Sequence, residues 1–109
     1  MTNKQTMKII SIGELGGYVV WFGEFSCDDV QKMVKIAEKH NMACLGFIEI
    51  HDDTFFNEEQ AVEIKNEVKI LRNYEKLNKN LLDTLFAAAE NSIRSSDYIK
   101  IERCGGLVI

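Results

Sequence analysis

Short runs of β-branched and aromatic residues alternate with stretches of helical periodicity along these 109 residues, and their order leaves few folds open. Residues 7–12 and 18–22 are two such runs on either side of the glycine-rich segment 13–17, a pattern that predicts a β-hairpin. A third strand is predicted over residues 43–50, where the first half of the run is wholly apolar. Residues 98–102 alternate and predict a fourth strand close to the C-terminus.

Three further segments carry helical signals. A helix is predicted to begin at Ser26, with Asp29 three residues later as in a capping box, and to end near His40. The last helix is predicted from a stripe of apolar residues at helical spacing, which contains Leu81, Leu82, Leu85, Phe86, Ala89 and Ile93. Residues 58–72 fit a strand through their even positions and a helix through their i, i+4 spacing. The Glu and Lys residues between the apolar positions favour helix, and Asn57 with Gln60 can cap its start.

The resulting order of elements, ββαβααβ, predicts one α+β domain over residues 1–109. In it, about three helices pack against a mostly antiparallel sheet of about four strands. An apolar fraction of 46% and a charged fraction of 28% are ordinary for a folded chain of this kind.

The negative charge of the chain is concentrated in one segment. The net charge is −4, from seventeen acidic and thirteen basic residues. Six of the acids lie between residues 49 and 64, where there is no Lys or Arg, so the rest of the chain holds eleven acids against thirteen bases. A segment of this charge disfavours nucleic acid and anionic membranes as partners and favours a basic protein.

Two adjacent aromatic residues, Phe55 and Phe56, lie inside this acidic run. Both cannot easily be buried from one short loop, so at least one is expected at the surface. Aromatic side chains among acids are typical of an interface that captures a basic partner. The predicted contact residues are Glu49, Asp52, Asp53, Phe55, Phe56, Glu58, Glu59 and Glu63. The alternative is a solvated face, in which Glu58 and Glu59 only complement the dipole of a helix N-terminus.

No motif in the chain predicts catalysis. His51 and Asp52 follow a predicted strand and could form a metal or acid–base cluster, but further ligands at a recognisable spacing are missing. The glycine-rich segment 13–17 is not followed by the Lys-Ser/Thr of a phosphate-binding loop. We therefore predict no catalytic residue, no metal and no cofactor, with a small enzyme or metal-binding domain centred on His51 and Asp52 as an alternative.

The three cysteines bear on the compartment. Cys27, Cys44 and Cys104 are odd in number and widely spaced, which predicts free thiols in a reducing cytoplasm. Cys44 is expected to be a small buried residue. The N-terminal residues contain no apolar stretch typical of a secretion signal, and the longest apolar runs are too short to span a bilayer. Self-association through the apolar tail 107–109 or a helix face is a further possibility.

Three stretches of this sequence resemble small bacterial immunity proteins of polymorphic-toxin, toxin–antitoxin and contact-dependent growth inhibition systems. The stretches are HDDTFFNEEQAVEIKNEVKIL, LLDTLFAAAENSI and YIKIE, about a third of the chain. The resemblance implies a cytoplasmic inhibitor that binds and neutralises the C-terminal toxin domain of a cognate protein, often a basic nuclease. Acidic anti-defence inhibitors of phages, which mimic nucleic acid, share the same features and remain an alternative.

Overall fold

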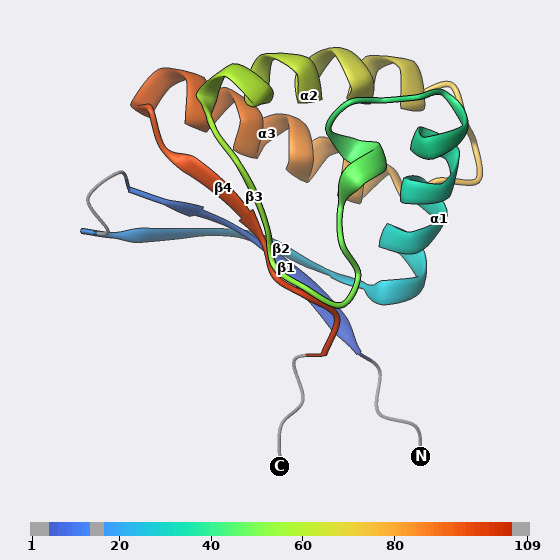
Figure 1. Cartoon of the computed structure of the whole chain (residues 1–109), viewed down its shortest axis with the longest axis horizontal. Coiled ribbons are helices and arrows are strands. Elements are labelled where there is room, and N and C mark those ends of the chain that lie inside the picture. Colours follow the sequence, from blue (N-terminus) through green and yellow to red (C-terminus); the bar gives the residue numbers. More distant parts are fainter. Residues whose placement is uncertain (1–4, 14–16, 106–109) are drawn as a thin grey trace.

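The computed structural model describes residues 5–13 and 17–105 and shows an α+β fold (Figure 1). Its elements, in chain order, are β1 (Thr6–Ile12), β2 (Val19–Ser26), α1 (Cys27–Lys39), a short 3-10 helix η1 (Leu45–Phe47), β3 (Thr54–Phe56), α2 (Glu58–Leu71), α3 (Lys79–Ser95) and β4 (Tyr98–Ile101). The predicted order of strands and α-helices is thus confirmed.

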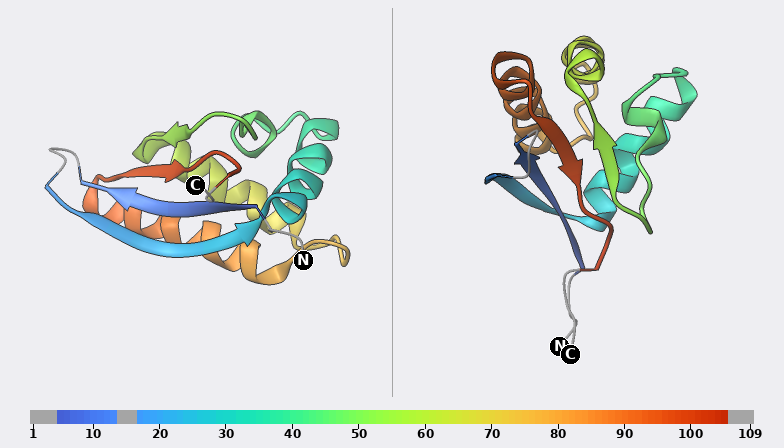
Figure 2. Two further views of the ribbon diagram at one scale, coloured as in Figure 1. Left: turned by 90° about the horizontal axis from the view of Figure 1, so that it is seen from below. Right: turned by 60° about the vertical axis from the view of Figure 1, so that its left-hand side comes forward.

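The four strands form one antiparallel sheet in the order β2-β1-β4-β3. The predicted hairpin is confirmed, because β1 pairs with β2 and the N–H of Gly13 donates to the carbonyl of Tyr18. Three residues of the predicted turn, 14–16, lie outside the described part. The helices lie on one side of the sheet, and no helix covers the opposite face in the part of the chain described (Figures 1 and 2).

The core lies between the helices and the inner face of the sheet. Alternate residues of the two central strands are buried, such as Met7 and Ile9 on β1 and Ile99 and Ile101 on β4. From the other side, α2 and α3 contribute fully buried aliphatic side chains, among them Ile64, Val68, Leu71, Leu81, Leu82 and Leu85. The ambiguous segment 58–72 is therefore a helix, and every third or fourth residue of it faces the core.

Each of the three α-helices begins with a side-chain cap. Ser26 accepts the N–H of Asp29 at α1, and Asn57 forms a reciprocal capping box with Gln60 at α2. At α3 the side-chain oxygen of Asn78 accepts the N–H groups of Asn80 and Leu81, while its amide nitrogen donates to the carboxylate of Asp29 at 2.9 Å. The capping residues thus also tie the start of α3 to the start of α1.

The strand predicted over residues 43–50 is wrong. Within this run the chain forms η1 instead, and the third strand is the three-residue β3, which follows in a segment predicted to be a loop. The cause is Glu67 of α2, a buried carboxylate that accepts the N–H of Cys44 at 3.1 Å and that of Leu45 at 2.7 Å. These bonds satisfy two backbone donors without a sheet partner, so an apolar run can be buried as a tight turn.

A second buried carboxylate, that of Asp97, connects the β1–β2 hairpin to the end of α3 through hydrogen bonds. Its oxygens accept the hydroxyl of Tyr18 at 2.8 and 2.9 Å, the hydroxyl of Ser11 at 3.2 Å and the amide of Asn91 at 3.3 Å. The hydrogen bond to Asp97 raises the pKa of Tyr18 above its ordinary value. This network connects β1 and β2 to the junction between α3 and β4.

Candidate partner-binding surface

The structure arranges the predicted contact residues along β3 and its two flanks. Asp52 and Asp53 precede β3, while Glu58 and Glu59 follow it in the first turn of α2. The strand between them is three residues long, about 10 Å. Because β3 is the last strand of the sheet, its outer side has no neighbouring strand in the described chain. We call the exposed side chains of this region the acidic edge; they are Glu49, Asp52, Asp53, Phe55, Glu58, Glu59 and Glu63.

The two adjacent phenylalanines point to opposite faces of the sheet. Successive side chains of a strand alternate between its faces, and here Phe55 is 55% exposed while Phe56 is 3% exposed and part of the core. The expectation that one of the pair is exposed is confirmed, but the inclusion of Phe56 among the contact residues is wrong. The ring of Phe55 lies 5.9 Å from Nζ of Lys100 on the open face of the sheet.

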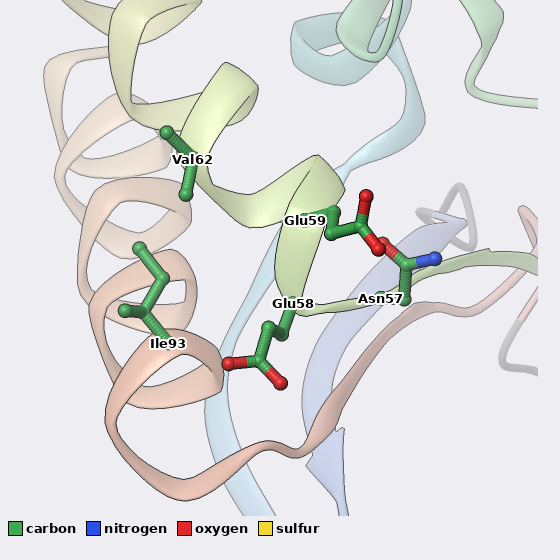
Figure 3. Close-up of a pocket in the computed structure, with 5 residues that line it drawn as sticks. All are labelled: Asn57, Glu58, Glu59, Val62 and Ile93. Atoms are coloured by element: carbon green, nitrogen blue, oxygen red, sulfur yellow. The ribbon is translucent and has the colours of Figure 1, made fainter.

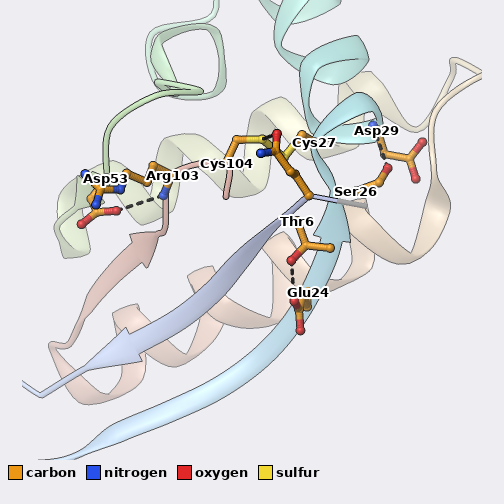
Figure 4. The surroundings of a disulfide bond; sticks show 9 residues. Thr6, Glu24, Ser26, Cys27, Asp29, Asp53, Arg103 and Cys104 are labelled. Atoms are coloured by element: carbon orange, nitrogen blue, oxygen red, sulfur yellow. Dashed lines mark hydrogen bonds between the residues drawn. A yellow bond between two sulfur atoms is a disulfide. The ribbon is translucent and has the colours of Figure 1, made fainter. Parts of the chain in front are cut away.

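Asp53 takes part in the fold. One carboxylate oxygen accepts the N–H of Arg103 at 2.9 Å (Figure 4). The other lies 3.7 Å from Nζ of Lys100. The bond from the Arg103 backbone, supported by Lys100, lowers the pKa of Asp53 below its ordinary value. Its charge is therefore partly compensated within the protein, so it contributes less to an attraction for a partner.

Glu58 and Glu59 border a hollow of about 430 Å³ together with Asn57, Val62 and Ile93 (Figure 3). Neither carboxylate forms an ion pair with any lysine or arginine whose position is described. The two remaining side chains, Val62 on α2 and Ile93 on α3, add apolar surface, and Val62 is half exposed. Carboxylates beside aliphatic side chains suit a lysine or arginine, whose stem is apolar and whose head is cationic.

Glu49 lies at a different hollow from Glu58 and Glu59. This second hollow, of about 300 Å³, is bordered by Glu38, Glu49 and the aromatic ring of Phe47. Phe47 is 70% exposed, although it lies in a run that predicts a buried strand. Its exposure follows from η1, a turn that the local sequence pattern does not indicate. The acidic edge therefore consists of separate acidic patches and not of one continuous cluster.

Cys27 and Cys104 form a disulfide, so the prediction of three free thiols is wrong (Figure 4). The bond joins the first residue of α1 to the segment that follows β4, across a sequence separation of 77 residues. Neither the number of cysteines nor their spacing indicates this pair. It also removes the support that free thiols gave to a reducing compartment.

The remaining cysteine, Cys44, is buried as predicted. Burial, followed by the negative charges of Glu67 and Glu63, raises the pKa of its thiol to about 11. A thiol in this environment is protonated at neutral pH and shielded from solvent, which are poor conditions for a nucleophile.

The structure does not assemble a metal cluster around His51 and Asp52. Both side chains are exposed, and within residues 5–13 and 17–105 no three His, Cys, Asp or Glu side chains are placed to hold one ion. The other histidine, His40, has its ring against Tyr74. No helix of the described chain is long and apolar enough to cross a bilayer. The tail 107–109 lies outside the described residues.

Comparisons of the chain with protein-family models, with curated proteins and with solved structures found no match.

Proposed function

We propose that this protein is a binding protein of immunity type, which captures and neutralises a basic toxin domain through the acidic edge. The observation that carries the proposal is the pair Glu58 and Glu59, whose carboxylates border a partly apolar hollow and have no basic partner among the described side chains. Two unpaired carboxylates at this position attract a cationic side chain, and the aliphatic groups beside them can shield the contact from water.

Phe55 supplies a second kind of contact. Its half-exposed ring lies on the open face of the sheet near Lys100, which in turn forms an ion pair with Asp53. An aromatic side chain that becomes buried on docking contributes to slow dissociation, whereas the surrounding acids mainly accelerate the encounter. We therefore expect Glu58 and Glu59 to increase the association rate constant, and Phe55 to lower the dissociation rate constant.

A cytoplasmic location belongs to the same proposal, since an inhibitor of this type acts where the toxin acts. The cytoplasm keeps most cysteine pairs reduced. The proposal therefore requires the protein to remain folded and active when Cys27 and Cys104 are reduced. The alternative of a nucleic-acid mimic shares the acidic edge but would bind a nucleic-acid-binding protein of another system.

The test is binding to a basic toxin domain encoded next to this protein, measured kinetically at several salt concentrations. The double variant Glu58→Lys/Glu59→Lys is expected to lose about 2–5 kcal/mol of binding free energy, with a slower and less salt-sensitive on-rate. Its stability should fall by only about 0.3–1 kcal/mol per charge, because both acids also complement the helix dipole.

Asp28→Lys is the matched control, because Asp28 is also exposed and lies in the first turn of a helix, α1. It should alter stability in the same way and leave binding unchanged. If Asp28→Lys weakens binding as much as the double variant does, the effect is one of overall charge and the proposed surface is wrong.

A further inference from the structure

The edge strand β2 has the composition of a strand that pairs with another chain. It ends the sheet on the side opposite to β3. Residues 17–23 contain no charge, and the side chains of Val19 and Trp21 are 62% and 60% exposed. Edge strands are normally protected by charged residues, by proline or by a covering element. In β2 the only such feature in this stretch is a bulge after Trp21.

Backbone groups of β2 are free to bond outward. The carbonyl of Tyr18 accepts the N–H of Gly13 and so faces β1. Since the backbone groups of an antiparallel strand alternate in direction, the N–H and C=O of Val19 face away from β1, as do those of Trp21. These groups have no partner strand in the described structure, because β2 is the last strand on this side.

The two most exposed apolar side chains of this edge, those of Val19 and Trp21, lie on the open face of the sheet. Val19 pairs with Ile12 and Trp21 pairs with Ile10 across β1. Residues paired in register share a face, and the helices pack against the other one (Figure 2). An antiparallel sheet commonly carries polar residues on the face that it leaves to solvent. The apolar surface here adjoins the unpaired edge, so one partner strand can cover both.

We propose that the partner is a second copy of this chain, which pairs with β2 antiparallel about a two-fold axis at Val20. Rotation about that axis places Val19 of one copy opposite Trp21 of the other, on the open face. The outward N–H and C=O groups of these two residues then form hydrogen bonds between the copies. Val20 lies opposite Val20 of the second copy, and this pair forms no hydrogen bond because the backbone groups of both residues face inward, each toward its own β1. Both aromatic–aliphatic pairs are favourable cross-strand pairs.

Charge selects β2 rather than β3 for this contact. The three residues on either side of Val20 carry no charge, and the first charged residue after them is Glu24. A two-fold pairing through β3 would instead bring the acids that flank this three-residue strand close to those of the second copy. Like charges opposite one another destabilise a strand pair. Because β2 and β3 are at opposite edges, a dimer through β2 leaves both acidic edges free, and each dimer can capture two partners.

The first test is the solution mass as a function of concentration, by sedimentation or light scattering. The wild type should approach twice the chain mass of 12.5 kDa as concentration rises. Val19→Pro removes one outward N–H in each copy, and the loss of two hydrogen bonds should weaken the dimer about thirtyfold. Proline at a solvent-facing N–H of an edge strand is compatible with the fold. Trp21→Lys should also weaken the dimer, at least about tenfold, because it replaces the apolar pair.

Ile70→Lys is the control, because Ile70 is a half-exposed aliphatic residue on α2, away from the sheet edge. It should leave the dimer intact. A wild type that stays monomeric up to submillimolar concentration overturns the proposal. So does a dimer that resists both β2 variants, or one that Ile70→Lys weakens equally. Circular dichroism of each variant separates loss of pairing from loss of folding.

The second test addresses the register. In a non-bonded antiparallel pair the two Cα atoms lie about 4.5 Å apart, within the range that a disulfide spans. Val20→Cys should therefore cross-link two copies when oxidised with copper phenanthroline. Val19→Cys and Trp21→Cys should not, because each of these residues lies opposite the other. Cross-linking at position 19 or 21 in preference to position 20 contradicts the proposed axis.

Discussion

The carboxylate of Glu67 on α2 accepts the N–H of Leu45 at 2.7 Å, although the two residues are 22 positions apart. The same carboxylate also accepts the N–H of Cys44, so a single side chain from a helix holds the start of η1. Both residues of this contact are buried. The shape of the segment between α1 and β3, and with it the exposure of Phe47, therefore depends on Glu67.

Replacement of Glu67 should destabilise the protein. Glu67→Ala leaves two buried N–H groups without an acceptor, so the free energy of unfolding is expected to fall by about 3 kcal/mol in urea titrations. Glu63→Ala, an exposed glutamate of the same helix, should change it by less than about 0.5 kcal/mol. Equal effects of the two variants would mean that the buried carboxylate does not hold η1.

Phe55 and Phe56 form a matched pair for separating binding from stability. Phe56→Ala opens a cavity in the core and should cost about 3–5 kcal/mol of unfolding free energy. Phe55→Ala should barely affect unfolding but should raise the rate of dissociation from the toxin domain, because only this ring is at the surface. Chemical denaturation and surface-based kinetics measure the two effects. Faster dissociation from Phe56→Ala alone, in protein that is still folded, would contradict this assignment.

Reduction of the disulfide should weaken the fold substantially. The bond closes a loop with a sequence separation of 77 residues, for which chain entropy gives a stabilisation of about 4.5 kcal/mol. Thermal unfolding with and without dithiothreitol measures this difference. The double variant Cys27→Ser/Cys104→Ser should unfold like the reduced wild type and be insensitive to reductant. A melting temperature of the wild type that is independent of reductant would show that the pair does not stabilise the native state.

Asp53 should make stability depend on pH in the acid range. The pKa of its carboxyl is lowered in the folded protein, chiefly by the N–H of Arg103, below the ordinary value of 3.8. The stabilisation is therefore present in full above that value, and it is lost as the pH falls through the lower folded-state pKa. Asp53→Asn should remove this part of the acid destabilisation.

Asp52→Asn serves as the comparison for Asp53→Asn, because Asp52 is exposed and makes no ion pair with a described residue. Urea unfolding of both variants and the wild type between neutral pH and about pH 3 measures the effect, a range set by the ordinary pKa of aspartate. Identical pH profiles of the wild type and Asp53→Asn would contradict the role of the Arg103 contact.

Local patterns in the sequence are sufficient to predict the caps of α1 and α2 and most of the elements, but not the Asn78 cap of α3. Ser26 and the pair Asn57 and Gln60 are recognisable because a cap and the N–H that it satisfies lie within one turn. The order ββαβααβ and the antiparallel sheet follow from the same short-range signals. The acidity of residues 49–64 is likewise visible, since it is a property of composition alone.

Contacts between distant residues decided everything else. The run 43–50 has the pattern of a strand, but Glu67 provides acceptors that only the folded chain brings near. Phe55 and Phe56 are equivalent in sequence, and pairing of Phe56 with Ile99 and of Phe55 with Lys100 determined which of them faces the core. Cys27 and Cys104 meet because α1 begins beside the end of β4. The spacing of the cysteines along the chain does not indicate this proximity. Periodicity is local, whereas register, turn shape and disulfide pairing depend on free energies of contacts across the whole fold.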